Sequence, residues 1–75
     1  MLTAPKTILV GDRVRYESAA GTIRGEVVKI ARDLNAAGDM IDWIHISHVQ
    51  NNRQVVTRLA DTALAMMKLK VTFRG

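Results

Sequence analysis

The fold class is decided by the stretch GDRVRYESAAGTIRGEVVKI, residues 11–30. In its first part Val14 and Tyr16 alternate with arginines, which is typical of a strand with one buried face and one exposed face. The small residues that follow, and Gly21 after them, let the chain reverse its direction. The stretch therefore predicts two antiparallel strands joined by a tight turn.

The chain has 75 residues, enough for one domain at most, and it contains no cysteine. A domain of this size buries only about 60% of the surface that its unfolded chain exposes, so good packing or self-association must support it. Without cysteine there is no disulfide framework and no thiolate metal site, which favours a reducing, cytoplasmic location. The sequence has no signal-peptide pattern and no run of ~20 apolar residues, so we expect no membrane partner.

We expect an N-terminal arm over residues 1–7 and a single β domain over residues 8–75. The apolar phase changes after Val27, and such a change inside one strand indicates a β-bulge or strong coil. The cleanest alternation lies near the C-terminus, where apolar residues alternate with Lys, Thr and Arg. The predicted strands are Ile8–Tyr16, Thr22–Ala31, Met40–Val49, Gln54–Leu59 and Lys68–Arg74.

The predicted connections differ in character. Arg32–Gly38 is rich in turn formers, and Gln50–Arg53 predicts a hairpin turn because asparagine tolerates positive φ. Asp61–Met67 predicts about one and a half helical turns, which Asp61 or Thr62 would cap. A single helix over Val55–Met67 is the alternative, and the β-branched residues at its start argue against it. In either case we expect less than about a quarter of the chain to be helical.

A set of apolar residues shares the inward phase of the predicted strands. The predicted core consists of Val14, Ile23, Val27, Ile44, Ile46, Leu69, Val71 and Phe73.

Five short strands with a helical turn before the last resemble the SH3-like small barrel of Tudor-type modules. In these modules a "gly-asp-x-val" entry leads into a hairpin whose second strand is strongly curved. Gly11-Asp12-Arg13-Val14 and the run Gly25–Ile30 carry the resemblance, which extends from about Ile8 to Arg74. It implies an all-β, five-stranded SH3-like barrel, and it implies no single function because this fold hosts many activities.

The sequence offers no arrangement typical of an enzyme. Plasmid-borne type II dihydrofolate reductases resemble the segment Gly11–Arg15, but their valine-glutamine-isoleucine-tyrosine pore motif is not carried over at Val49-Gln50. His45 and His48 are three residues apart on a strand and so project to opposite faces, which excludes a shared metal ion. We expect no enzymatic activity, no cofactor and no metal.

Two sets of residues are candidates for binding. Trp43 either lies outward, where its indole can stack on a partner, or belongs to the core, which large aromatic residues dominate in small domains. The second set consists of basic residues that point outward from the first and last strands, which are neighbours in SH3-like barrels. This set, Arg13, Arg15, Lys68, Lys70 and Arg74, either forms one phosphate-binding face or simply solvates the surface and protects strand edges.

These observations lead to two hypotheses about function. The first is a non-catalytic adaptor that binds a protein partner through its strand faces and the loop Asp33–Asp39. The alternative is a nucleic-acid-binding module that uses the basic face, with the net charge of +4 as modest support. Homo-oligomerisation through an exposed strand would use the same surfaces.

Overall fold

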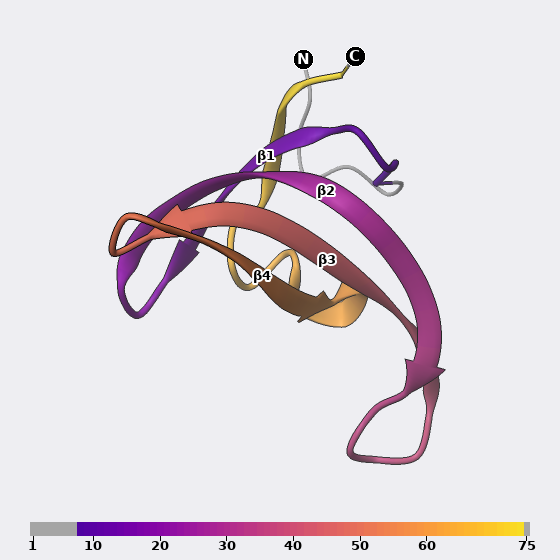
Figure 1. The fold of residues 1–75 in the computed structure, drawn as a ribbon. Helices are drawn as coiled ribbons and strands as arrows, with labels where there is room; N and C mark the ends of the chain where they lie inside the picture. The colour runs from indigo at the N-terminus through magenta and orange to yellow at the C-terminus, as the bar shows by residue number, and fades with distance from the viewer. Residues whose placement is uncertain (1–7, 75) are drawn as a thin grey trace.

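The computed structural model describes residues 8–74, which form one curved antiparallel sheet (Figure 1). The elements along the chain are β1 (Arg13–Ser18), β2 (Gly21–Leu34), β3 (Met40–Gln50), β4 (Arg53–Ala60), the 3-10 helix η1 (Asp61–Ala63) and β5 (Lys70–Phe73). The strand order is β4-β3-β2-β1-β5. This confirms the prediction of an all-β fold with five strands and a helical turn before the last one. The expected arm over residues 1–7 lies outside the described residues.

β4 and β5 form the two edges of this sheet. Hydrogen-bonded ladders join all the neighbouring strands, and within residues 8–74 no ladder joins β4 to β5. The sheet is therefore strongly curved without being closed by hydrogen bonds. The described part of the chain also contains no helix that is long and apolar enough to cross a membrane.

Two tight turns reverse the chain where the sequence predicts them. In the β1–β2 hairpin, Ser18 pairs with Gly21, and the hydroxyl of Ser18 donates to the carbonyl of Gly21 at 2.9 Å. In the β3–β4 hairpin, Asn51 and Asn52 have φ of 53° and 61°, the positive values that asparagine tolerates.

The connection between β2 and β3 is shorter than the predicted loop over Arg32–Gly38. β2 continues to Leu34, which pairs with Met40, so only residues 35–39 form the turn. The side-chain oxygen of Asn35 accepts hydrogen bonds from the backbone N–H groups of Ala37 and Asp39, each at 2.9 Å. The strands extend this far because one asparagine satisfies the turn's backbone donors locally.

The core lies on one face of the sheet and matches most of the predicted set. It consists of the buried residues Ile8, Val14, Tyr16, Val27, Ile44, Ile46, Leu59, Leu69 and Val71, with Ile23, Ile30, Leu64 and Met67 packed against them. The predicted bulge in β2 is confirmed, since pairing steps from Val27–Ile46 to Lys29–His45 and leaves Val28 as the extra, exposed residue.

Phe73 is the exception, and its placement in the core was wrong. Its side chain is 60% exposed. Val71 pairs with Val14, but Phe73 pairs with Arg13, so one extra residue, Thr72, lies in β5 opposite no partner. Directly opposed residues share a face of the sheet, and Phe73 therefore follows the exposed side chain of Arg13.

The segment between β4 and β5 also departs from the prediction. η1 has three residues, so the alternative helix over Val55–Met67 is excluded. Ala60 occupies the N-cap position with no side-chain cap, so Asp61 and Thr62 do not cap it as expected. Lys68 has a φ of 54°, which delays the start of β5 to Lys70.

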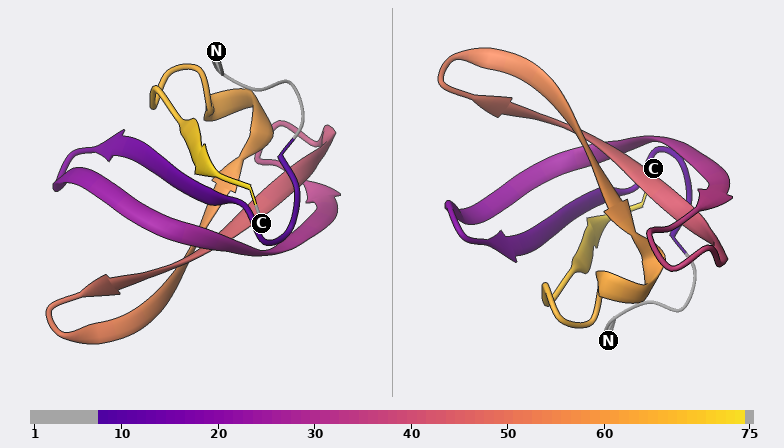
Figure 2. Two further views of the ribbon diagram at one scale, coloured as in Figure 1. Left: turned by 90° about the horizontal axis from the view of Figure 1, so that it is seen from above. Right: turned by 90° about the horizontal axis from the view of Figure 1, so that it is seen from below.

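β2 passes unusually close to β3 at Gly25. A Cβ atom placed on Gly25 would lie 2.5 Å from the carbonyl oxygen of Ser47 and 2.6 Å from Cγ2 of Ile46. Only glycine therefore permits this approach. Beyond it the β1–β2 and β3–β4 hairpins diverge in direction (Figure 2).

We expect Gly25→Ala to lower the free energy of unfolding by at least about 2 kcal/mol, because the added methyl group meets the backbone carbonyl oxygen of Ser47 as well as the buried side chain of Ile46. Gly38→Ala is the control, since Gly38 has open space around it and only its φ of 86° opposes alanine. That strain should cost about 1 kcal/mol. Urea unfolding of both variants measures the difference, and equal losses would contradict the close approach at Gly25.

Candidate functional site

Three basic side chains form a row across β5, β1 and β2. Arg15 lies directly opposite Lys70 on one side and directly opposite Arg24 on the other. All three side chains are exposed. We call Lys70, Arg15 and Arg24 the cationic row. Among the described residues no ion pair involves any member of the row, although Glu17 and Glu26 lie on the neighbouring outward positions of β1 and β2.

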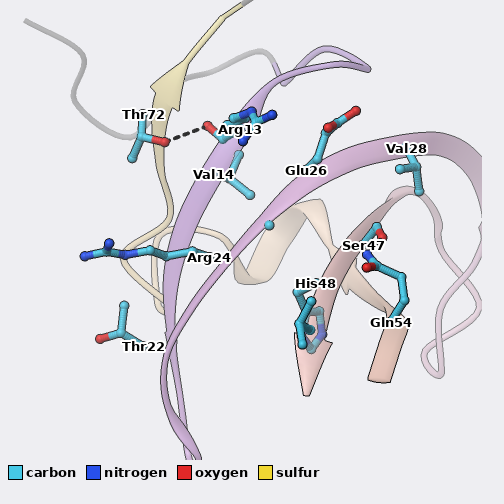
Figure 3. Close-up of a pocket in the computed structure, with 12 residues that line it drawn as sticks. Arg13, Val14, Thr22, Arg24, Glu26, Val28, Ser47, His48, Gln54 and Thr72 are labelled. Atoms are coloured by element: carbon cyan, nitrogen blue, oxygen red, sulfur yellow. Dashed lines mark hydrogen bonds between the residues drawn. The ribbon is translucent and has the colours of Figure 1, made fainter. Parts of the chain in front are cut away.

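Two hollows flank the cationic row. One, of about 370 Å³, is lined by Arg15, Tyr16, Glu17, Thr22, Lys68 and Lys70. The other, of about 660 Å³, lies between the two diverging hairpins, and its lining includes Arg13, Arg24, Ser47, His48 and Gln54 (Figure 3). In Figure 3 the guanidinium of Arg24 points away from Ser47, His48 and Gln54. Cations from three strands thus converge on one side of the molecule.

The structure brings together only part of the predicted basic set. Arg15, Lys68 and Lys70 line the same hollow, and Arg13 lies one outward position further along β1. Arg74 is instead engaged by Asp12. The sequence reasoning missed Arg24, although the tight turn could have revealed it. Once Ser18 pairs with Gly21, antiparallel register places Arg24 opposite Arg15.

Asp12 is almost completely buried, and its carboxylate is fully engaged. Arg74 donates to it through Nε at 3.0 Å and Nη2 at 3.1 Å, and the backbone N–H of Leu9 donates at 2.9 Å. The hydrogen bond from Arg74 is the main cause that lowers the pKa of Asp12, against the opposing effect of burial. The same pairing raises the pKa of Arg74. This ion pair joins the start of the sheet to its last strand.

Trp43 is half-buried and lies outside the main core cluster. The guanidinium carbon of Arg58 lies 4.9 Å from the centroid of the indole ring, a cation–π arrangement. The indole Nε1 is buried and has no hydrogen-bond partner among the described residues. Arg58 therefore occupies one face of the Trp43 ring, and that face is not free to stack on a partner.

A buried polar group lies within the core between β1, β3 and β4. His48 is buried, and its Nε2 lies 2.8 Å from the hydroxyl of Thr57. Burial raises the pKa of the Tyr16 phenol, and a hydrogen bond with Thr57 opposes that rise. Thr57 thus serves two buried partners at once. His45 points to the other face, where it pairs with Arg58, and the described residues contain no His, Cys, Asp or Glu cluster that could hold a metal ion.

The loop predicted to contribute to binding lies far from the cationic row. Asp33 sits near the end of β2 and Arg24 near its beginning, so about nine residues of strand, roughly 30 Å, separate them. The turn at residues 35–39 is closed on itself by Asn35. The row and this turn therefore cannot form one small site.

Comparisons of the chain with protein-family models, with curated proteins and with solved structures give no match.

We expect Thr57→Val to lower the free energy of unfolding by about 1–3 kcal/mol. Valine keeps the shape of threonine but leaves His48 and Tyr16 without their shared partner. Val56→Thr exchanges the same two shapes at an exposed position and should change stability by less than about 0.5 kcal/mol. Thermal or urea unfolding measures both, and similar effects of the two variants would contradict the role of Thr57.

We expect the stability of the protein to fall in acid, in part through Asp12. Its pKa is lower in the folded protein than in the unfolded chain, so its contribution is complete above about pH 4 and is lost as the pH falls through the lowered pKa. Asp12→Asn should weaken this acid sensitivity when urea midpoints are compared at about pH 6 and about pH 3. Asp42→Asn, which removes a more exposed carboxylate, is the control. Equal changes in the two variants would contradict the prominence of Asp12.

Proposed function

We propose that this protein is a non-catalytic β module that binds the phosphate backbone of nucleic acid through the cationic row. The observation that carries the proposal is the direct opposition of Lys70, Arg15 and Arg24 across three adjacent strands. Like charges placed directly opposite each other destabilise a sheet. An anionic partner that lies across the row would neutralise this repulsion, and the planar guanidinium of arginine can bind phosphate through two parallel hydrogen bonds.

Protection of strand edges explains only part of the row. β5 is an edge strand, so Lys70 can serve there to discourage pairing with another chain. Arg15 and Arg24 belong to β1 and β2, each of which has a strand on both sides. Their side chains therefore protect no edge. Edge protection, the alternative that the sequence left open, therefore does not explain Arg15 and Arg24.

We also propose that the fold is the SH3-like barrel of Tudor-type modules. Two features support this finer assignment: β1 and β5 are neighbours, and a 3-10 helix precedes the last strand. In this arrangement β1 lies in the interior of the sheet, so Arg15 on β1 has Lys70 of β5 on one side and Arg24 of β2 on the other. The fold thus provides the platform for the row but does not determine its ligand.

A protein partner is the second candidate, and one observation favours it. Val28, Val49 and Val56 are exposed on β2, β3 and β4. Val28 and Val49 both line the larger hollow, beside Ser47 and Gln54. An adaptor would cover these side chains with apolar groups of its partner. This surface extends from β2 across β3 to β4, away from β1 and β5, although Arg24 of the cationic row also lines the hollow.

The experiment compares two triple variants of identical composition. Arg15→Ala/Arg24→Ala/Lys70→Ala removes the cationic row, and Lys29→Ala/Arg32→Ala/Arg53→Ala removes two arginines and one lysine elsewhere. Fluorescence anisotropy with a labelled oligonucleotide at several salt concentrations gives the affinity and its salt dependence. The row variant should bind more weakly, and its logarithmic salt slope should fall by up to about 2–3. The control variant should keep most of the wild-type affinity and most of its salt slope.

The same variants also separate a binding role from a structural one. Because the row is repulsive, its removal should leave the unfolding temperature unchanged or raise it. If both triple variants lost the same amount of affinity, net charge alone would explain the binding, and the proposal would be contradicted. A wild-type protein that fails to bind at about 50 mM salt, where phosphate contacts are strong, would contradict it as well.

A further inference from the structure

Phe73 lies beside the cationic row on the outward side of the sheet. It is directly opposite Arg13, and Arg13 is two residues, or about 7 Å, along β1 from Arg15. Its ring is 60% exposed. Tyr16 is buried, and Trp43 is half-buried with Arg58 over one face of its ring, so Phe73 is the most exposed of the three aromatic side chains, all of which lie within residues 8–74.

A β-bulge in β5 places Phe73 on this side of the sheet. Leu69 and Val71 are buried, and uninterrupted alternation would bury Phe73 as well. The extra residue Thr72 reverses the phase, and its hydroxyl donates to the carbonyl of Arg13 at 3.2 Å. Bulges that re-aim a side chain are frequent beside functional sites. Exposing the only phenylalanine removes a large apolar side chain from the core of a small domain, so the bulge costs stability that a partner can return.

We propose that Phe73 stacks on a base of single-stranded nucleic acid whose phosphates lie on the cationic row. This inference rests on the proposed function and names its ligand more narrowly. Proteins that bind single strands combine a cationic surface, which follows the backbone, with exposed aromatic rings, on which bases stack. In a duplex the flat faces of the bases are stacked on their neighbours, so a ring reaches them only at the cost of unstacking a base step, a cost that an unpaired strand largely avoids. DNA and RNA share this chemistry.

The test separates stacking from phosphate contacts. One labelled oligonucleotide is an oligothymidylate of about 12 nucleotides, within the site size of small single-strand-binding modules. A second has the same length and phosphates but abasic sugars, and a third is a duplex. Wild-type protein should bind the first about 5–150 times more tightly than the second in fluorescence anisotropy, the range that one stacked base provides. It should also prefer the single strand to the duplex.

Variants at position 73 test whether the preference for the base-bearing strand depends on the ring of Phe73. Phe73→Ala and Phe73→Leu should bind the base-bearing and abasic strands with nearly equal affinity, because neither has an aromatic ring. Phe73→Tyr should keep the wild-type preference. Val56→Ala is the matched control, since Val56 is an exposed apolar residue of β4 away from the row, and it should also keep the preference. The leucine variant retains apolar bulk, so it tests the ring even if the alanine variant unfolds.

Each outcome decides between the two proposals. If Phe73→Leu keeps the preference for the base-bearing strand, Phe73 does not stack on a base. If wild-type protein binds the base-bearing and abasic strands equally, or binds the duplex as well as the single strand, the inference is wrong while phosphate binding by the row stands. If wild-type protein binds none of the three, both proposals fail.

Discussion

Asp12 joins the beginning, the middle and the end of the described chain in a protein that has no disulfide. Its carboxylate accepts hydrogen bonds from Arg74 and Leu9, and its backbone carbonyl accepts one from Val27 at 2.8 Å. Burying a carboxylate is costly unless N–H donors satisfy its oxygens, and here they do. Gly11, with a φ of 97°, makes the bend that brings Asp12 to this point. The Gly-Asp pair therefore fixes where the sheet begins and where its last strand must lie.

The surface of β1 follows from this constraint. Because Arg74 is held at Asp12, β5 lies against β1, and β1 becomes an interior strand between β5 and β2. Its inward side chains, Val14 and Tyr16, belong to the core. Its outward arginines are then flanked by neighbouring strands on both sides. The same interaction that organises the core thus creates the outward surface on which the cationic row lies.

The sequence predicted the elements that depend on local alternation, and it predicted the bulge in β2 from a visible change of phase, but it missed the bulge in β5. Ile44 and Ile46 share the core face as expected, because nothing interrupts the period of two in β3. Phe73 fits the same pattern in the sequence, and its exposure depends on Thr72, whose role as the extra residue becomes visible only from the pairing with β1. The outward positions of Arg13, Arg15 and Lys70 were also predictable, because these residues alternate with buried ones along their strands. Arg24 required the hairpin register as well.

The arginines of the molecule differ in their surroundings. On β2, β3 and β4, Arg32 pairs with Asp42 and Arg58 lies over Trp43, while Lys29 and Arg53 have no ion pair among the described residues. On β5, β1 and β2, the cationic row likewise has no ion pair among the described residues, and Phe73 is exposed beside it. Sequences that fold well avoid conflicts between local arrangement and stability, except where a site needs them. Two independent conflicts lie on one surface, a charge repulsion and an exposed aromatic ring, and the proposed ligand, with its phosphates and flat unpaired bases, would relieve both.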